Sequence, residues 1–386
     1  MVNFFGRKSS SNHISINTID QEVQTILLPL NTMQYIMFNP KYRIKNNYIF
    51  PNNLLTNCLS LTAKIFFIIS YGYSTYFSVQ YTEELPVIFQ QFLYFYDFVF
   101  YCIGFIVVFV IQITQSKNSL MFVLVFQKVH RVLNNEIKTK RTVFSIWTVV
   151  ILTSLFFPCY LTAYSILASF PFHFLIASFF FAVFDFNIVY ATQVMKLLTN
   201  KVDLWNSYVE HGEKLEDRHG GDYYEKLFQT YVDILECYDI HNSCYRAFIM
   251  FYIMEVFNHS LVYIEEALMV IQYGFEYYES ISQISWVTIL IFIWLLKNFL
   301  LLTKLIHQYE KFYIAVGNAH DTCTHMLRTT NSDAEKRLCK NMLRVHRASF
   351  SKMSLYGMFH VDAVLQQGLM MLLTEYTVVL LQFTFL

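Results

Sequence analysis

Long apolar stretches recur along the chain and alternate with shorter polar segments. A helix needs about 20 mainly apolar residues to cross the roughly 30 Å hydrocarbon core of a bilayer. On that criterion the pattern predicts membrane-spanning helices at residues 52–79, 86–113, 142–165, 168–195, 247–273, 283–306 and 354–385. Glycine (10) and proline (6) are scarce, so these seven helices are expected to be mostly continuous.

The residues before the first span, 1–51, are mainly polar but contain the apolar piece QTILLPLNTMQYIMF. This piece is too short to span a bilayer, so we expect a short interfacial helix or a helix packed against the bundle. The start of the chain, MVNFFGRKSS, is charged but has no apolar core after it. No cleaved signal peptide is therefore expected.

Composition favours an all-α membrane protein and excludes several other classes. Hydrophobic residues make up 55% of the chain and charged residues 15%, an imbalance that is unusual for soluble domains. The formal net charge is zero, which argues against a nucleic-acid partner. The seven cysteines are scattered and form no CxxC pair. Neither a disulfide framework nor a metal site is predicted, and no cofactor is expected.

The basic residues predict the orientation in the membrane. Lysine and arginine gather in four segments, namely 1–51, 114–141, 196–246 and 297–352. The connections without any basic residue lie near 80–85, 165–168 and 274–282. Because basic residues concentrate on the cytoplasmic side, the N-terminus is predicted to be cytoplasmic and the C-terminus extracellular. This is the reverse of a G-protein-coupled receptor, which disfavours a metabotropic receptor. A secondary transporter is disfavoured because no repeat with paired helix breaks is visible.

Two of the cytoplasmic segments show helical patterns. Residues 196–246 keep helical spacing on both sides of Gly220 and Gly221, which predicts helices that leave the fourth span and enter the fifth. Residues 307–352 contain a capping box at Ser332 and Glu335. The apolar stripe that follows the box is Leu338, Met342 and Val345. These helices either cover the base of the bundle or form a platform where subunits meet.

An enzyme is not expected. The segment GNAHDTCTH places His320, Asp321, Cys323 and His325 close together. However, it lies in a predicted helix, and its spacing matches no set of metal ligands. Structural polar residues are the simpler interpretation.

The last predicted span has polar residues on one face. At about 3.6 residues per turn, the stripe consists of Gln367, Met371, Glu375 and Gln382, with Val378 and Val379 between them. An intramembrane carboxylate is costly and faces protein or water rather than lipid. Either Glu375 and Gln382 hydrogen-bond within one bundle, or the stripe lines a wet pore between several copies, with Glu375 as a cation-favouring ring. The periodicity leaves both interpretations open.

The motif EYTVVLLQF in this helix resembles the C-terminal signature of insect gustatory receptors, in which Thr-Tyr, five apolar residues and Gln-Phe follow one another. The preceding GMFHVDAVLQQGLMMLL resembles the opening of the same helix, with Phe359, Val361 and Asp362 as its aromatic-x-Val-Asp element. The predicted spans and basic cytoplasmic loops are similar to the family over nearly the whole chain. The chain departs from the family at Glu375, where the signature has Thr.

This resemblance implies a ligand-gated, non-selective cation channel. The family is homotetrameric, with one pore on the four-fold axis, and hetero-oligomers with other gustatory receptors are a further option. No G protein would be required, and the site of action would be the plasma membrane of gustatory receptor neurons. The domains implied are 1–51 as cytoplasmic segment, 52–306 as ligand-binding bundle (with cytoplasmic helices around 114–141 and 196–246), 307–352 as anchor helices and 353–386 as pore helix. The pore and gate residues implied are Gln382, Phe383, Glu375, Val379 and Tyr376.

The resemblance also implies a ligand pocket in the outer half of spans two to six. The helix ends there hold aromatic residues with a few polar groups, which suits a small amphipathic ligand. The candidate ligand-binding residues are Tyr96, Asp97, Tyr164, His173, Tyr263, Glu266 and Trp286. The same ends also hold Tyr94, Tyr160, Phe172, Phe174, Gln272 and Gln283. The alternative for each aromatic is an interfacial belt residue.

The tail resembles receptors for bitter plant compounds more than sugar receptors, because Thr377 rather than Glu follows the Tyr. The tastant is therefore expected to be a small plant compound, with a sugar or polyol as the alternative.

Overall fold

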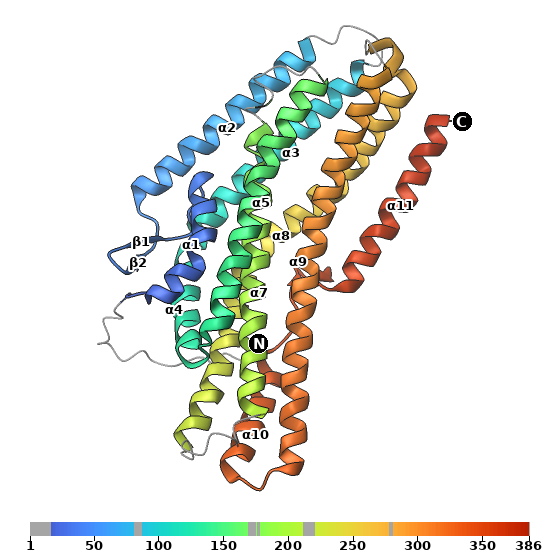
Figure 1. Ribbon diagram of the computed structural model, residues 1–386. Coiled ribbons are helices and arrows are strands. Elements are labelled where there is room, and N and C mark those ends of the chain that lie inside the picture. Colours follow the sequence, from blue (N-terminus) through green and yellow to red (C-terminus); the bar gives the residue numbers. More distant parts are fainter. Residues whose placement is uncertain are drawn as a thin grey trace.

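The computed structural model describes residues 17–385 except 81–86, 169–174, 176–177, 211–220 and 278–280. The described chain is mostly helical (Figure 1). Its helices are α1 (Gln21–Ile36), α2 (Leu54–Gln80), α3 (Val87–Thr114), α4 (Ser116–Val132), α5 (Glu136–Ala168), α7 (Ala182–Glu210), α8 (Gly221–Tyr277), α9 (Ile281–Thr329), α10 (Asp333–Ser349) and α11 (Ala363–Phe385).

Within the described residues, six helices are long and apolar enough to cross a membrane. They are Leu54–Phe77, Phe95–Thr114, Glu136–Leu167, Tyr223–Leu268, Ser285–Thr329 and Ala363–Gln382. Each contains or overlaps one predicted span. The seventh prediction, 168–195, is not among them, because part of it lies outside the described residues. Its described part belongs to α7, which includes polar positions such as Asp185 and Asn187.

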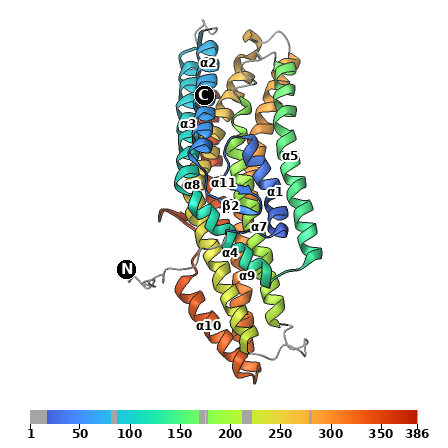
Figure 2. The ribbon, with the colours of Figure 1, turned by 90° about the vertical axis from the view of Figure 1, so that its left-hand side faces the viewer.

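α8 and α9 are much longer than a membrane span, with 57 and 49 residues. α8 begins at Gly221, where the sequence predicts a turn, and continues without a break through the fifth predicted span. α9 continues from the sixth span to Thr329, so the predicted anchor segment 307–352 is partly an extension of that span. Figure 2 shows α10 at one end of the molecule, against the extended ends of these helices.

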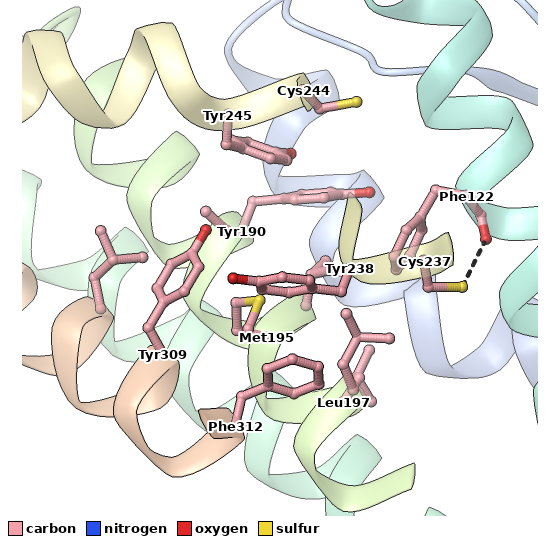
Figure 3. Packing of buried hydrophobic residues seen from close by; sticks show 14 of the residues in the cluster. Phe122, Tyr190, Met195, Leu197, Cys237, Tyr238, Cys244, Tyr245, Tyr309 and Phe312 are labelled. Carbon is pink, nitrogen blue, oxygen red and sulfur yellow. Dashed lines mark hydrogen bonds between the residues drawn. The ribbon is translucent and has the colours of Figure 1, made fainter. Parts of the chain in front are cut away.

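Part of the buried core lies where α7 meets α8 and α9 (Figure 3). The ring of Tyr238 on α8 stacks on Phe312 of α9 at 4.7 Å between centroids. The ring of Tyr190 on α7 stacks on Tyr245 of α8 at 6.0 Å. Such aromatic pairs add about 0.5–1.5 kcal/mol each beyond the burial of their area. This part of the bundle is therefore packed like the core of a soluble protein.

α10 begins at the predicted capping position. The Ser332 side chain accepts a hydrogen bond from the Glu335 backbone N–H at 3.5 Å. The Glu335 carboxylate does not return to Ser332, as a full capping box requires, but accepts hydrogen bonds from the Tyr224 hydroxyl at 2.6 Å and from the Thr330 hydroxyl. Leu338 and Met342 of the predicted stripe are buried. The Tyr224 contact therefore fixes the start of α10 to α8.

Two short hairpins, which the sequence analysis did not predict, interrupt the mostly helical chain. β1 (Arg43–Lys45) pairs with β2 (Tyr48–Phe50), and β3 (Ser354–Leu355) pairs with β4 (Phe359–His360). The first turn has Asn46 and Asn47 at φ 53° and 63°, the backbone of a two-residue type I′ hairpin. The second contains Tyr356 and Gly357 at φ 54° and 80°. Because of this turn, the last helix begins at Ala363 rather than at the predicted residue 354.

α11 lies along the outside of the bundle and is separated from most of it in Figure 1. Asp362 caps its N-terminus, because the Oδ1 atom accepts hydrogen bonds from the backbone N–H groups of Val364 and Leu365 at 3.1 and 3.4 Å. The Asp362 Oδ2 atom also lies 3.1 Å from Lys352 Nζ. Val361, directly before it, is fully buried. The aromatic-x-Val-Asp element thus anchors and starts this helix.

Candidate functional site

A cavity of about 120 Å³ lies within the helix bundle. Its lining residues come from α2, α3, α5, the segment before α7, α8 and α9: Tyr71, Ser74, Thr75, Asp97, Tyr160, Leu161, Tyr164, Ser178, Phe181, Tyr263, Glu266, Ile291 and Trp294. These residues lie in the parts of their helices that are predicted to be nearer the outside. The volume is of the same order as an engineered cavity of about 150 Å³ that binds benzene. The cavity can therefore hold a ligand of about one ring.

Aromatic rings form most of the cavity wall. The Tyr71 ring meets Phe181 edge-on, at 4.9 Å between centroids and 88° between planes. The Tyr160 ring, which also lines the cavity, lies 5.2 Å from Trp294 and 6.0 Å from Tyr164. The Tyr160 hydroxyl donates a hydrogen bond to the Leu290 carbonyl at 3.1 Å, so its ring is fixed in place.

Asp97 is held by a histidine that the sequence did not suggest. The Nε2 atom of His259 lies 3.3 Å from Asp97 Oδ1, and His259 is fully buried on α8. The other ring nitrogen, Nδ1, lies 3.0 Å from the Glu255 backbone carbonyl. A carbonyl can only accept, so Nδ1 bears a hydrogen. A protonated His259 would form an ion pair with Asp97 at this distance, although Nε2 and Oδ1 do not form a hydrogen bond in this geometry.

A second ionic cluster lies deeper in the bundle. Lys297 Nζ contacts Asp185 Oδ2 at 2.5 Å, and both side chains are largely buried. The same ammonium lies 3.7 Å from the centroid of the Trp294 ring, within cation–π range. The Tyr252 hydroxyl donates to Asp185 Oδ1 at 3.3 Å. This ion pair joins α7 to α9 and contacts Trp294, which lines the cavity.

The structure brings together four of the candidate ligand residues, because Asp97, Tyr164, Tyr263 and Glu266 all line the cavity. Tyr96 is not among the lining residues, although its ring lies 6.3 Å from His259. Trp286 is 44% exposed and is not among the lining residues. His173 lies outside the described residues.

Several lining residues escaped prediction. Tyr71, Ser74 and Thr75 belong to α2, the first span, whereas the pocket was expected from spans two to six. Trp294 lies about two turns further along α9 than the predicted Trp286. The spacing of the apolar residues fixes which part of each helix lies in the membrane but not its rotation about its own axis. This explains why Trp294 was missed, whereas the first span was left out because the resemblance implied a pocket in spans two to six.

The second functional region is the exposed face of α11. Among its described side chains, 363–382, only Leu369 is fully buried. The packed stripe, which faces the bundle, consists of Leu369, Leu373, Thr377 and Leu380. At about 100° per residue, its centre lies roughly 170° from the centre of the polar stripe Gln367, Met371, Glu375 and Gln382.

In consequence, Glu375 and Gln382 are exposed and point away from their own bundle. Val379 is exposed as well, and Tyr376 is half exposed, with its ring 6.1 Å from Phe257 of α8. The side chain of Phe383 lies outside the described residues.

The polar cluster in GNAHDTCTH is not assembled into a site. His320 and Asp321 form an exposed contact at 3.2 Å, while Cys323 is buried. Over the described part of the chain, no group of three or more His, Cys, Asp and Glu residues could hold a metal ion.

The fold is similar to that of a solved insect receptor. The structure of the insect olfactory receptor OR5 from Machilis hrabei covers 94% of this chain and 100% of its own length, with a TM-score of 0.59 and 11% sequence identity. The structure of OR5 from Machilis hrabei in complex with eugenol gives the same coverage, 12% identity and a TM-score of 0.49. No protein-family model and no curated protein sequence matches the chain. At this identity the similarity establishes the architecture: the chain shares the fold of an insect olfactory receptor.

Proposed function

We propose that this protein is a ligand-gated cation channel of the insect chemoreceptor type, with several copies of α11 around one pore. The observation that supports this most strongly is the polar stripe of α11. Glu375 and Gln382 face away from the bundle, where a single chain would expose a carboxylate and an amide to lipid. Such exposure is strongly unfavourable. Around a shared, water-filled axis the same side chains are solvated.

The arrangement of the subunits follows the resemblance to insect gustatory receptors, a group in the same superfamily as the olfactory receptors. The assembly is a homotetramer with a cytoplasmic N-terminus and an extracellular C-terminus, in the plasma membrane of gustatory receptor neurons. α10 and the extended ends of α8 and α9 form the platform that joins the subunits. Gln382 and Phe383 form the gate at the outer end of the pore.

The cavity and the pore helix are connected through α8. Tyr263 and Glu266 on α8 line the cavity, and Phe257 on the same helix contacts Tyr376 of α11. From Phe257 to Glu266 the helix rises by about 13 Å. A ligand that binds more tightly to the open arrangement shifts the population toward it. When the population shifts toward the open arrangement, α8 is displaced and moves α11 outward from the pore axis.

The ligand is a small organic tastant, and a bitter plant compound fits the similarity of the tail. An odorant is the second candidate, because the solved receptor with this fold is olfactory.

Expression in oocytes tests the proposal directly. Currents are recorded while alkaloids, glucosides, sugars, polyols and volatile aromatics are applied, and at least one compound is expected to open a cation conductance. Glu375→Gln is then expected to lower the permeability of divalent relative to monovalent cations. Unchanged relative permeability would place Glu375 outside the pore wall, and ligand-evoked responses that require a G protein would refute the channel.

A further inference from the structure

The cavity has an excess of negative charge. Among the residues that the structure describes, Asp97 and Glu266 are the charged residues of its lining, and this described lining contains no lysine or arginine. Asp97 has a histidine beside it, because His259 Nε2 lies 3.3 Å from its Oδ1 atom, and a protonated His259 offsets the charge of Asp97. Glu266 therefore remains as the carboxylate without a basic partner among the described residues. A half-buried carboxylate that faces a cavity inside the bundle is stabilised by a positive partner or by a proton.

The walls of the cavity suit a cation as well. Tyrosine and tryptophan rings attract ammonium groups through their negative faces, and Tyr160, Tyr164, Tyr263 and Trp294 all line the cavity. Trp294 already accepts one ammonium, that of Lys297, at 3.7 Å. Lys297 is itself engaged by Asp185, so it does not neutralise Glu266.

From these features we infer that the ligand is a small protonated amine with about one ring, whose ammonium pairs with Glu266 while its ring lies among the tyrosines and Trp294. This inference rests on the proposed function, because it names the ligand class for the same cavity.

An uncharged polyol fits less well. It would leave the charge of Glu266 uncompensated, and a cavity of about 120 Å³ is small for a sugar ring with all its hydroxyl groups. A neutral aromatic would fill the space but would gain nothing from the carboxylate. The amine satisfies charge, size and aromatic surface together.

The test uses benzylamine and benzyl alcohol, which differ little in shape but differ in charge. Binding is measured as thermal stabilisation of the purified receptor in detergent, a readout that does not depend on gating. Benzylamine is expected to bind at least about 30-fold more tightly than benzyl alcohol, since an unpaired buried charge costs about 2 kcal/mol or more. Glu266→Gln is expected to abolish this preference. The control is Glu265→Gln, at the preceding residue of α8, which is not part of the cavity lining; this variant should preserve the preference.

Equal binding of the two compounds to the unaltered receptor would overturn the inference, and this comparison does not depend on whether any variant folds. A preference retained in Glu266→Gln would overturn it as well. Preferential binding of benzylamine without any ion current would support the amine site but refute the proposed channel. Currents evoked by neutral compounds alone, without a preference for benzylamine, would support the channel and refute the amine site.

Discussion

α7 and α11 are both predominantly apolar helices, but they differ completely in how they are packed. In α7, 23 of 29 residues are buried, including Asp185, Asn187 and Gln193, whose polar groups lie inside the bundle. In α11 only one of the described side chains is fully buried. α7 holds a single subunit together, whereas α11 has its polar stripe on the side that the subunit leaves open. In the proposed channel, other copies of the chain would complete the surroundings of α11.

The largest effect is expected from the core around α7. Trp205 is fully buried, and its Nε1–H donates to the Leu227 carbonyl at 2.8 Å. Trp205→Ala should lower the free energy of unfolding by about 3–5 kcal/mol, seen as a lower apparent melting temperature in detergent. Val378→Ala on the exposed side of α11 is the control and should change it by only about 0.5 kcal/mol. A similar loss of unfolding free energy in both variants would show that α11 is packed as tightly as α7.

The ion pair between α7 and α9 gives the next effect. Lys297→Met leaves Asp185 charged and buried, which costs about 3–5 kcal/mol unless Asp185 takes up a proton. The double variant Asp185→Asn, Lys297→Met removes both charges and should recover most of the lost stability. The stability of the single and the double variant is compared through their surface expression and their monodispersity in detergent. A double variant as unstable as the single one would show that the pair itself, rather than charge compensation, is required.

A smaller effect is expected at the start of α11. Asp362→Ala removes the N-cap, which is worth about 1 kcal/mol. α11 contributes little to the packing of its own subunit, so the melting temperature should hardly change. The basal current or the sensitivity to ligand, in contrast, should change. Asp362→Asn keeps a capping oxygen but loses the contact with Lys352, so it should behave more like the parent. A change in melting temperature without any change in current would assign Asp362 a purely structural role.

Sequence patterns were sufficient for much of this fold. The length of the apolar runs located six helices able to span a membrane, and the Ser332 cap was predicted at the right residue. The hairpins were not predicted because each depends on a few residues with positive φ, such as Asn46 and Asn47. The contact of His259 with Asp97 was not predicted because the two residues are 162 positions apart in the chain. The rotation of each helix, and with it the choice of Trp294 over Trp286, is decided by tertiary packing.

The most direct test of the central claim is a cysteine scan of α11. Gln367, Met371, Glu375 and Gln382 of the polar stripe, and Leu369, Leu373 and Leu380 of the packed stripe, are replaced one at a time by cysteine. A positively charged thiol reagent is then applied during recording, with the parent as control because it already has Cys58 and Cys159 exposed. Block is predicted at the polar stripe and not at the packed stripe. Block at the packed stripe alone, or at neither, would contradict a pore lined by α11.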